Sequence, residues 1–191
     1  MNRKIIIIGV SLILLLILFV LFFLKFKPIT IEQAKSNFKA YENQLKEIAA
    51  NRGFIFKVIE EEFDDSRVYV ITNDKVIITI DFHIPKDEKI INDYFSVSYY
   101  KEKNQDKIDV KLFLEIINAM SKVSMAEEYC INFLEAPEEK YPAREWVGRP
   151  DDAKIYKVDF LKNYFISYSL RDNNMEELYV VGKTKNKYYI N

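Results

Sequence analysis

Glycine, proline, cysteine and histidine are all scarce in this chain. Its 191 residues include four Gly, five Pro, one Cys and one His. No GxGxxG or GxxxxGKS/T motif occurs, which excludes the glycine-rich loops that hold dinucleotides and nucleoside triphosphates. The scarcity of glycine and proline also disfavours long disordered linkers. A single cysteine excludes a disulfide within the chain.

Motifs for metal binding and for nucleophilic catalysis are missing as well. There is no HxxxH, HExxH or CxxC, so the sequence predicts no metal and no cofactor. No serine stands in a GxSxG motif. The net charge is −1 and the basic residues form no cluster, so we expect no nucleic-acid partner. These absences favour a protein that is not an enzyme.

What the sequence does have is a long apolar segment near its beginning. Residues 5–24 read IIIIGVSLILLLILFVLFFL and carry no charge. A helix of this length is about 30 Å long, at about 1.5 Å per residue, and matches the hydrocarbon core of a bilayer. The next residues, KFKP at 25–28, lack the small residues of a signal-peptide cleavage site. We therefore expect an uncleaved single-pass anchor in the lipid bilayer, with a cleaved signal as the alternative.

The charges around the apolar segment bear on its orientation. Arg3 and Lys4 precede it and Lys25 and Lys27 follow it, so the contrast in basic residues is weak. All acidic residues lie after position 28, and the modestly acidic part that they form is not attracted by an anionic cytoplasmic leaflet. We expect residues 1–27 to be a short cytoplasmic tail and transmembrane anchor. Residues 28–191 are expected to form one domain outside the cytoplasm of a bacterial cell.

An apolar stripe with spacings of three and four predicts the first helix of this domain. The helix runs from Thr30 to about Arg52, with Gly53 as its C-terminal cap. The stripe fits a helix lying on its own sheet or a short coiled-coil stem, and fewer than three heptads favour the first. Its residues are Ile31, Ala34, Phe38, Tyr41, Leu45 and Ile48.

Alternating apolar residues, with turn residues between them, predict seven strands. We place a tight two-residue turn at Asn73-Asp74 and a second long helix over Asp109 to Leu134, where apolar residues again share one face. The expected fold is α+β, in the order α-β-β-β-β-α-β-β-β, with an antiparallel sheet packed against helices. The predicted strands are 54–63, 67–72, 75–84, 93–101, 154–161, 164–171 and 177–183.

This order repeats a helix followed by strands. Residues 28–103 and 107–191 are therefore either two related αβ units or parts of one sheet covered by two helices. No diagnostic motif of a family matches. The helix at 30–52 followed by the strands to 101 is similar in order to cystatin-like and NTF2-like domains. That resemblance implies a fold of this general kind and no particular function, because many folds share the order.

The best candidate for a functional surface is the loop 135–153. Tyr141, Arg144, Trp146 and Arg149 stand close together in it between two prolines. Tyrosine, tryptophan and arginine are the residues that dominate interface hot spots, so these four are our candidate partner-binding residues. In the alternative, Trp146 covers the core and the arginines pair with neighbouring acids.

Three other features are weaker candidates. His83, the only histidine, follows Asp81 at the spacing that shares a strand face, but further metal ligands are lacking. The acids at 60–62, 64 and 65 could serve glycoside hydrolysis or hold Ca²⁺, although a solvated turn explains them equally. Cys130 lies on the apolar stripe of the second long helix, so we expect it to be buried and unreactive.

Together these features predict a membrane-anchored, non-catalytic, extracytoplasmic binding domain. We expect it to be an accessory subunit of a bacterial envelope assembly that binds an unidentified protein partner. One alternative is an immunity protein that intercepts a secreted toxin at the membrane. The other is a surface hydrolase that uses the acidic residues or His83.

Overall fold

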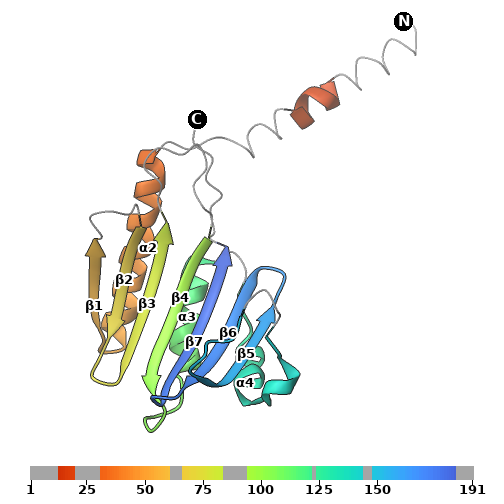
Figure 1. The fold of residues 1–191 in the computed structure, drawn as a ribbon. Coiled ribbons are helices and arrows are strands. Elements are labelled where there is room, and N and C mark those ends of the chain that lie inside the picture. The colour runs from red at the N-terminus through yellow and green to blue at the C-terminus, as the bar shows by residue number, and fades with distance from the viewer. Residues whose placement is uncertain are drawn as a thin grey trace, which may run out of the picture.

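The structure, a computed structural model, describes residues 13–19, 31–60, 66–83, 94–121, 124–143 and 148–183. It confirms the predicted α+β class, because a seven-stranded antiparallel sheet packs against helices (Figure 1). The elements are α2 (Ile31–Asn51), β1 (Ile55–Glu60), β2 (Ser66–Thr72), β3 (Val76–His83), β4 (Tyr94–Glu102), α3 (Val110–Met120), α4 (Glu127–Glu135), the 3₁₀ turn η1 (Glu138–Lys140), β5 (Ala153–Phe160), β6 (Tyr164–Arg171) and β7 (Met175–Lys183).

Two antiparallel meanders make up the sheet, in the order β1-β2-β3-β4-β7-β6-β5. They meet where β4 pairs with β7, with Val97 opposite Val180. The two parts of the chain therefore contribute to one sheet covered by helices. The strand that comes last in the sequence lies in the middle of the sheet (Figure 1).

The first helix packs on the first meander, as its apolar stripe predicts. The rings of Phe38 and Tyr41 lie 5.2 and 5.4 Å from the ring of Phe82 on β3. Gly53 has a φ of 72° and follows the helix, and the N–H of Phe54 donates to the carbonyl of Ala49 at 2.9 Å. Glycine adopts this left-handed conformation without strain, so the predicted cap is confirmed. The stripe of α2 thus packs on its own sheet.

Alternation along the strands separates the two faces of the sheet. Ile78, Ile80 and Phe82 are fully buried under the helices, whereas Thr79 and Asp81 point to the opposite face. In Figure 1 the helices α2, α3 and α4 lie on the same face of the sheet.

Glycine is required at one position in the central pair of strands. On β7, Gly182 lies opposite Phe95 of β4 and Tyr164 of β6. An added Cβ at this position would come within 2.8 Å of both rings. The close approach of the two aromatic rings across β7 therefore depends on the missing side chain.

The prediction of one long helix over 109–134 is wrong. The chain forms α3 and α4 instead, and Ser121 between them has extended backbone angles. The hydroxyl of Ser121 accepts a hydrogen bond from Tyr164 at 2.6 Å, and Asn118 accepts one from the N–H of Met125. Serine and asparagine side chains compete with helical hydrogen bonds in this way, and the continuous apolar stripe concealed the break.

The tight turn between β2 and β3 lies one residue later than predicted. Asp74 and Lys75 are its central residues, and the N–H of Asn73 donates to the carbonyl of Val76. The Asn73 side chain accepts hydrogen bonds from the N–H groups of Lys75 and Val76, at 2.9 and 2.8 Å. This local bonding of an asparagine side chain sets the turn.

Most of the predicted anchor lies outside the described residues. Residues 13–19 are helical, and each of their side chains is at least half exposed. Within the residues described, no helix has the length and apolar character needed to cross a membrane.

Candidate functional site

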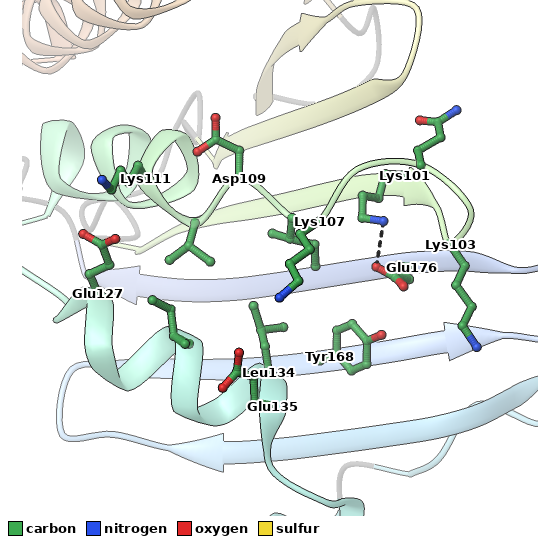
Figure 2. A pocket seen from close by; sticks show the side chains of 14 residues that line it. Lys101, Lys103, Lys107, Asp109, Lys111, Glu127, Leu134, Glu135, Tyr168 and Glu176 are labelled. Atoms are coloured by element: carbon green, nitrogen blue, oxygen red, sulfur yellow. Dashed lines mark ion pairs between the residues drawn. The ribbon is translucent and has the colours of Figure 1, made fainter.

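A pocket of about 440 Å³ opens between α3 and α4 (Figure 2). Lys101, Tyr168 and Glu176 reach it from β4, β6 and β7, and the two helices form its walls. The set of lining residues is Lys101, Lys103, Gln105, Lys107, Ile108, Asp109, Val110, Lys111, Glu127, Ile131, Leu134, Glu135, Tyr168 and Glu176. It lies where the two meanders join, so both parts of the chain are needed to build it.

An ion pair at the base of the pocket spans that junction. Lys101 lies directly opposite Glu176 in the β4–β7 pairing, and its Nζ is 3.0 Å from Oε2 of Glu176. Only 2 % of the Lys101 side chain and 14 % of the Glu176 side chain are exposed. Burial, together with the hydrogen-bonded Glu176 carboxylate, raises the pKa of the Tyr168 phenol to about 12. The phenol therefore stays protonated at neutral pH.

The α3 wall is fixed at its first turn. Asp109 caps the helix, because its Oδ1 accepts from the N–H of Leu112 at 2.9 Å. Arg52, just after α2, donates to Asp109 at 3.3 Å and to Glu115 at 2.8 Å. The Tyr99 hydroxyl accepts from the N–H of Asp109. These bonds tie the start of α3 to the first meander.

The α4 wall is fixed by β5. Lys157, 2 % exposed, donates from its Nζ to the carbonyls of Phe133, Leu134 and Ala136, at 2.7, 2.5 and 3.0 Å. These are carbonyls that the end of a helix leaves without partners, and the cation also complements the helix dipole. Burial lowers the pKa of Lys157, while nearby Glu138 opposes that shift. Lys157 thus holds the C-terminal end of α4 against β5.

Charged groups of both signs stand free around the pocket. Lys103, Lys107 and Lys111, with Glu127 and Glu135, form no ion pair with any other residue that the structure describes. Figure 2 shows Lys107 reaching over the space between α3 and α4.

Apolar side chains and one unused acceptor lie among these charges. Ile108, Val110, Ile131 and Leu134 give the pocket its apolar walls. Within the described structure, Oε1 of Gln105 is buried and accepts no hydrogen bond. The apolar walls and the charges around them suit a ligand with both apolar and charged groups.

The pocket is lined by lysines, carboxylates, a glutamine, a tyrosine and apolar side chains. No serine, threonine, cysteine or histidine is among them, and the Glu176 carboxylate is already paired. In the described part of the chain, no three His, Cys, Asp or Glu side chains gather as metal ligands.

The four residues predicted for partner binding have different surroundings. Tyr141 is half-buried, with its ring 5.0 Å from that of Phe133 on α4. Arg149 pairs with Glu138 and also donates to the carbonyls of Ala153 and Lys154. Arg144 and Trp146 lie outside the described residues. The structure therefore brings Tyr141 and Arg149 against their own chain, near the C-terminal end of α4.

Cys130 is buried, as predicted. Its side chain has no exposed surface, Sγ is 3.1 Å from Sδ of Met125, and burial raises the pKa of the thiol to about 12. His83 ends β3, but its side chain and the acids at 61–65 lie outside what the structure describes. Asp81, on the face away from the helices, does not reach the pocket.

The sequence analysis missed this pocket. One signal was available, because Lys101, Lys103, Lys107 and Lys111 occur within eleven residues around the start of α3. Lys101 and Lys103 have the spacing of a strand face, whereas Lys103, Lys107 and Lys111 have that of a helix face, so no single element predicts one site. The four lysines line one pocket with α4 only in the folded chain. Comparisons with models of protein families, with curated proteins and with solved structures found no match to this chain.

Proposed function

We propose that this chain is a membrane-anchored binding protein whose domain, residues 28–191, lies outside the cytoplasm and holds a segment of a protein partner. The pocket between α3 and α4 is the contact site. The observation that carries the proposal is the combination of apolar walls with unpaired charges of both signs. A protein segment offers both complements, namely apolar side chains and charged side chains.

The anchor is proposed from residues 5–24 alone. Their apolar length matches a bilayer, and the domain after them is modestly acidic. Membrane attachment would let an accessory subunit of an envelope assembly, or an immunity protein, meet its partner at the membrane. Alkaline extraction followed by intact mass checks this part of the proposal. A species in the aqueous fraction that lacks residues 1–24 would overturn it.

Photo-crosslinking in membranes tests the pocket. A photoreactive amino acid in place of Lys107 should give a discrete adduct with one protein, and Ile131→Asp in the same chain should abolish that adduct. Ile131 is 37 % exposed, so this change alters the wall without opening the core. The matched control is the same photoreactive residue in place of Lys162, which is exposed in the turn between β5 and β6. Equal adducts at both positions, or none at Lys107, would contradict the proposal.

The loop residues Arg144 and Trp146 extend the proposed contact. Hot-spot residues of these types lose about 2 kcal/mol or more of binding free energy when changed to alanine. Arg144→Ala and Trp146→Ala should therefore weaken the Lys107 adduct while leaving the melting temperature unchanged. A Trp146→Ala protein that melts early would instead assign that side chain to the core.

A further inference from the structure

The two edge strands of the sheet differ in how their backbones are used. At the β5 edge, the N–H of Val158 donates to the carbonyl of Tyr141 at 3.0 Å. The carbonyls of Ala153 and Lys154 accept from the Arg149 guanidinium, at 2.9 and 2.7 Å. The residues after α4 therefore occupy this edge and leave little of it for another strand.

The β1 edge has no such cover. β1 pairs with β2 on one side, and no residue that the structure describes hydrogen-bonds to its other side. Every second N–H and C=O of an edge strand points outward in this position. Ile55, Val58 and Ile59 are 58, 39 and 47 % exposed. Ile55 and Ile59 stand on the face away from the helices and Val58 on the helix face, so apolar surface flanks the free edge on both faces.

We propose that β1 accepts an extended segment of a partner protein as an eighth strand of the sheet. An edge strand with free backbone groups and flanking apolar side chains is the surface on which such strand addition occurs. Backbone hydrogen bonds supply the attachment, and side chains beside the edge select the sequence. The inference stands on β1 alone and does not depend on the pocket between α3 and α4.

Charge defines the chemistry of the added segment. Lys57 lies between Ile55 and Ile59 on the open face, is exposed, and forms no ion pair with a described residue. An acidic residue on the added strand, flanked by β-branched apolar residues, complements this pattern. Opposite charges across neighbouring strands attract, and like charges repel. The occupant is therefore a short extended segment with an acid at its centre.

A second copy of this chain fits the edge less well. Antiparallel self-pairing that matches Ile55 with Ile59 of the other copy sets Lys57 directly opposite Lys57. Two like charges in that position destabilise the pair. A heterologous acidic segment avoids this repulsion, so we assign the edge to a partner protein.

Hydrogen exchange on the full chain in lipid nanodiscs tests the assignment. The probe is the blocked heptapeptide TVIEVIT, N-methylated on alternate residues so that only one of its edges can pair. It should slow exchange of the β1 amides and leave the β5 amides unchanged. The analogue TVIKVIT should bind about twofold to fivefold more weakly, the range of a cross-strand ion pair. Lys57→Glu should reverse the order of the two peptides.

Several outcomes would overturn the proposal. These are unchanged β1 exchange, equal protection at β5, or the same peptide order in Lys57→Glu. Protection by a control peptide N-methylated along both edges would show that binding is not strand addition. Slow β1 exchange without peptide, together with a dimer mass in ultracentrifugation, would assign the edge to a second copy. The Ile131→Asp variant should keep the peptide effect, which separates this result from a failure of the pocket.

Discussion

At β5 the sheet is closed by its own chain, whereas at β1 no residue of the described ranges covers the edge. β5 is backed by α4, flanked by η1 and hydrogen-bonded by Tyr141 and Arg149. β1 has α2 on one face only, and exposed isoleucines on the other. Both strands end the same sheet, so the difference comes from what the sequence places beside them. This difference indicates that the β5 edge contributes to stability, whereas the β1 edge is the one we propose for contact with a partner.

The comparison is sharpest for two lysines on these strands. Lys157→Met should lower the free energy of unfolding by about 3 kcal/mol, because three carbonyls of α4 lose a charged donor. Lys57→Met, at the exposed edge, should change it by no more than about 0.5 kcal/mol. Urea denaturation of the full chain in mild detergent measures both. Equal effects would mean that Lys157 does not hold α4 on β5.

A pair of tyrosines tests the contact between α4 and β5, with a control on the inner strand β4. The hydroxyl of Tyr129 on α4 donates to Asp159 of β5 at 2.7 Å, and burial is the first cause of its raised pKa. Tyr129→Phe should cost about 1–2 kcal/mol, since a partly buried carboxylate loses its donor. Tyr94→Phe is the control, because Tyr94 is 42 % exposed and its hydroxyl makes no described hydrogen bond. A control that loses as much stability as Tyr129→Phe would refute the bond's importance.

Cys130, on α4, makes the stability of this side depend on pH. Burial raises the pKa of the Cys130 thiol from its ordinary value of 9.0 to about 12. The buried, protonated thiol therefore contributes fully to the free energy of unfolding below pH 9, and this contribution is lost as pH rises toward 12. Cys130→Ala should cost about 1 kcal/mol at pH 7 through lost packing, and the gap to the wild type should narrow above pH 9. Val58→Ala, at the β1 edge, should show a pH-independent difference. Denaturation at pH 7 and pH 10 measures both, and a widening gap for Cys130→Ala would reverse the argument.

Arg149 gives the smallest expected change. Its ion pair with Glu138 is partly exposed, and such pairs contribute about 0–1 kcal/mol. Arg149→Ala should therefore lower stability only slightly, while the carbonyls of Ala153 and Lys154 become free. The heptapeptide TVIEVIT should then begin to slow exchange at β5 as well as at β1. Exchange at β5 that stays unaffected by the peptide would show that the rest of the loop suffices to close this edge.

The elements that the sequence predicted correctly are those that local pattern determines. The stripe of α2, its cap at Gly53 and the alternation of β3 each follow from side chains a few residues apart. The break at Ser121 was missed because the apolar stripe continues across it. The pairing of β4 with β7 was missed because it joins residues about eighty positions apart, and the ion pair of Lys101 with Glu176 depends on it. The pocket could not be predicted for the same reason.

The central place of β7 has a consequence for how the chain is made. Until residues 175–183 have emerged, β4 and β6 have no strand between them, and the middle of the sheet is an open gap with two unpaired edges. Long-range pairing of this kind is slow, and unpaired edges are prone to aggregation. A nascent chain must therefore carry its first meander through synthesis until β7 arrives. Deletion of β7 alone would remove its pairing with both β4 and β6, and would therefore separate the two meanders.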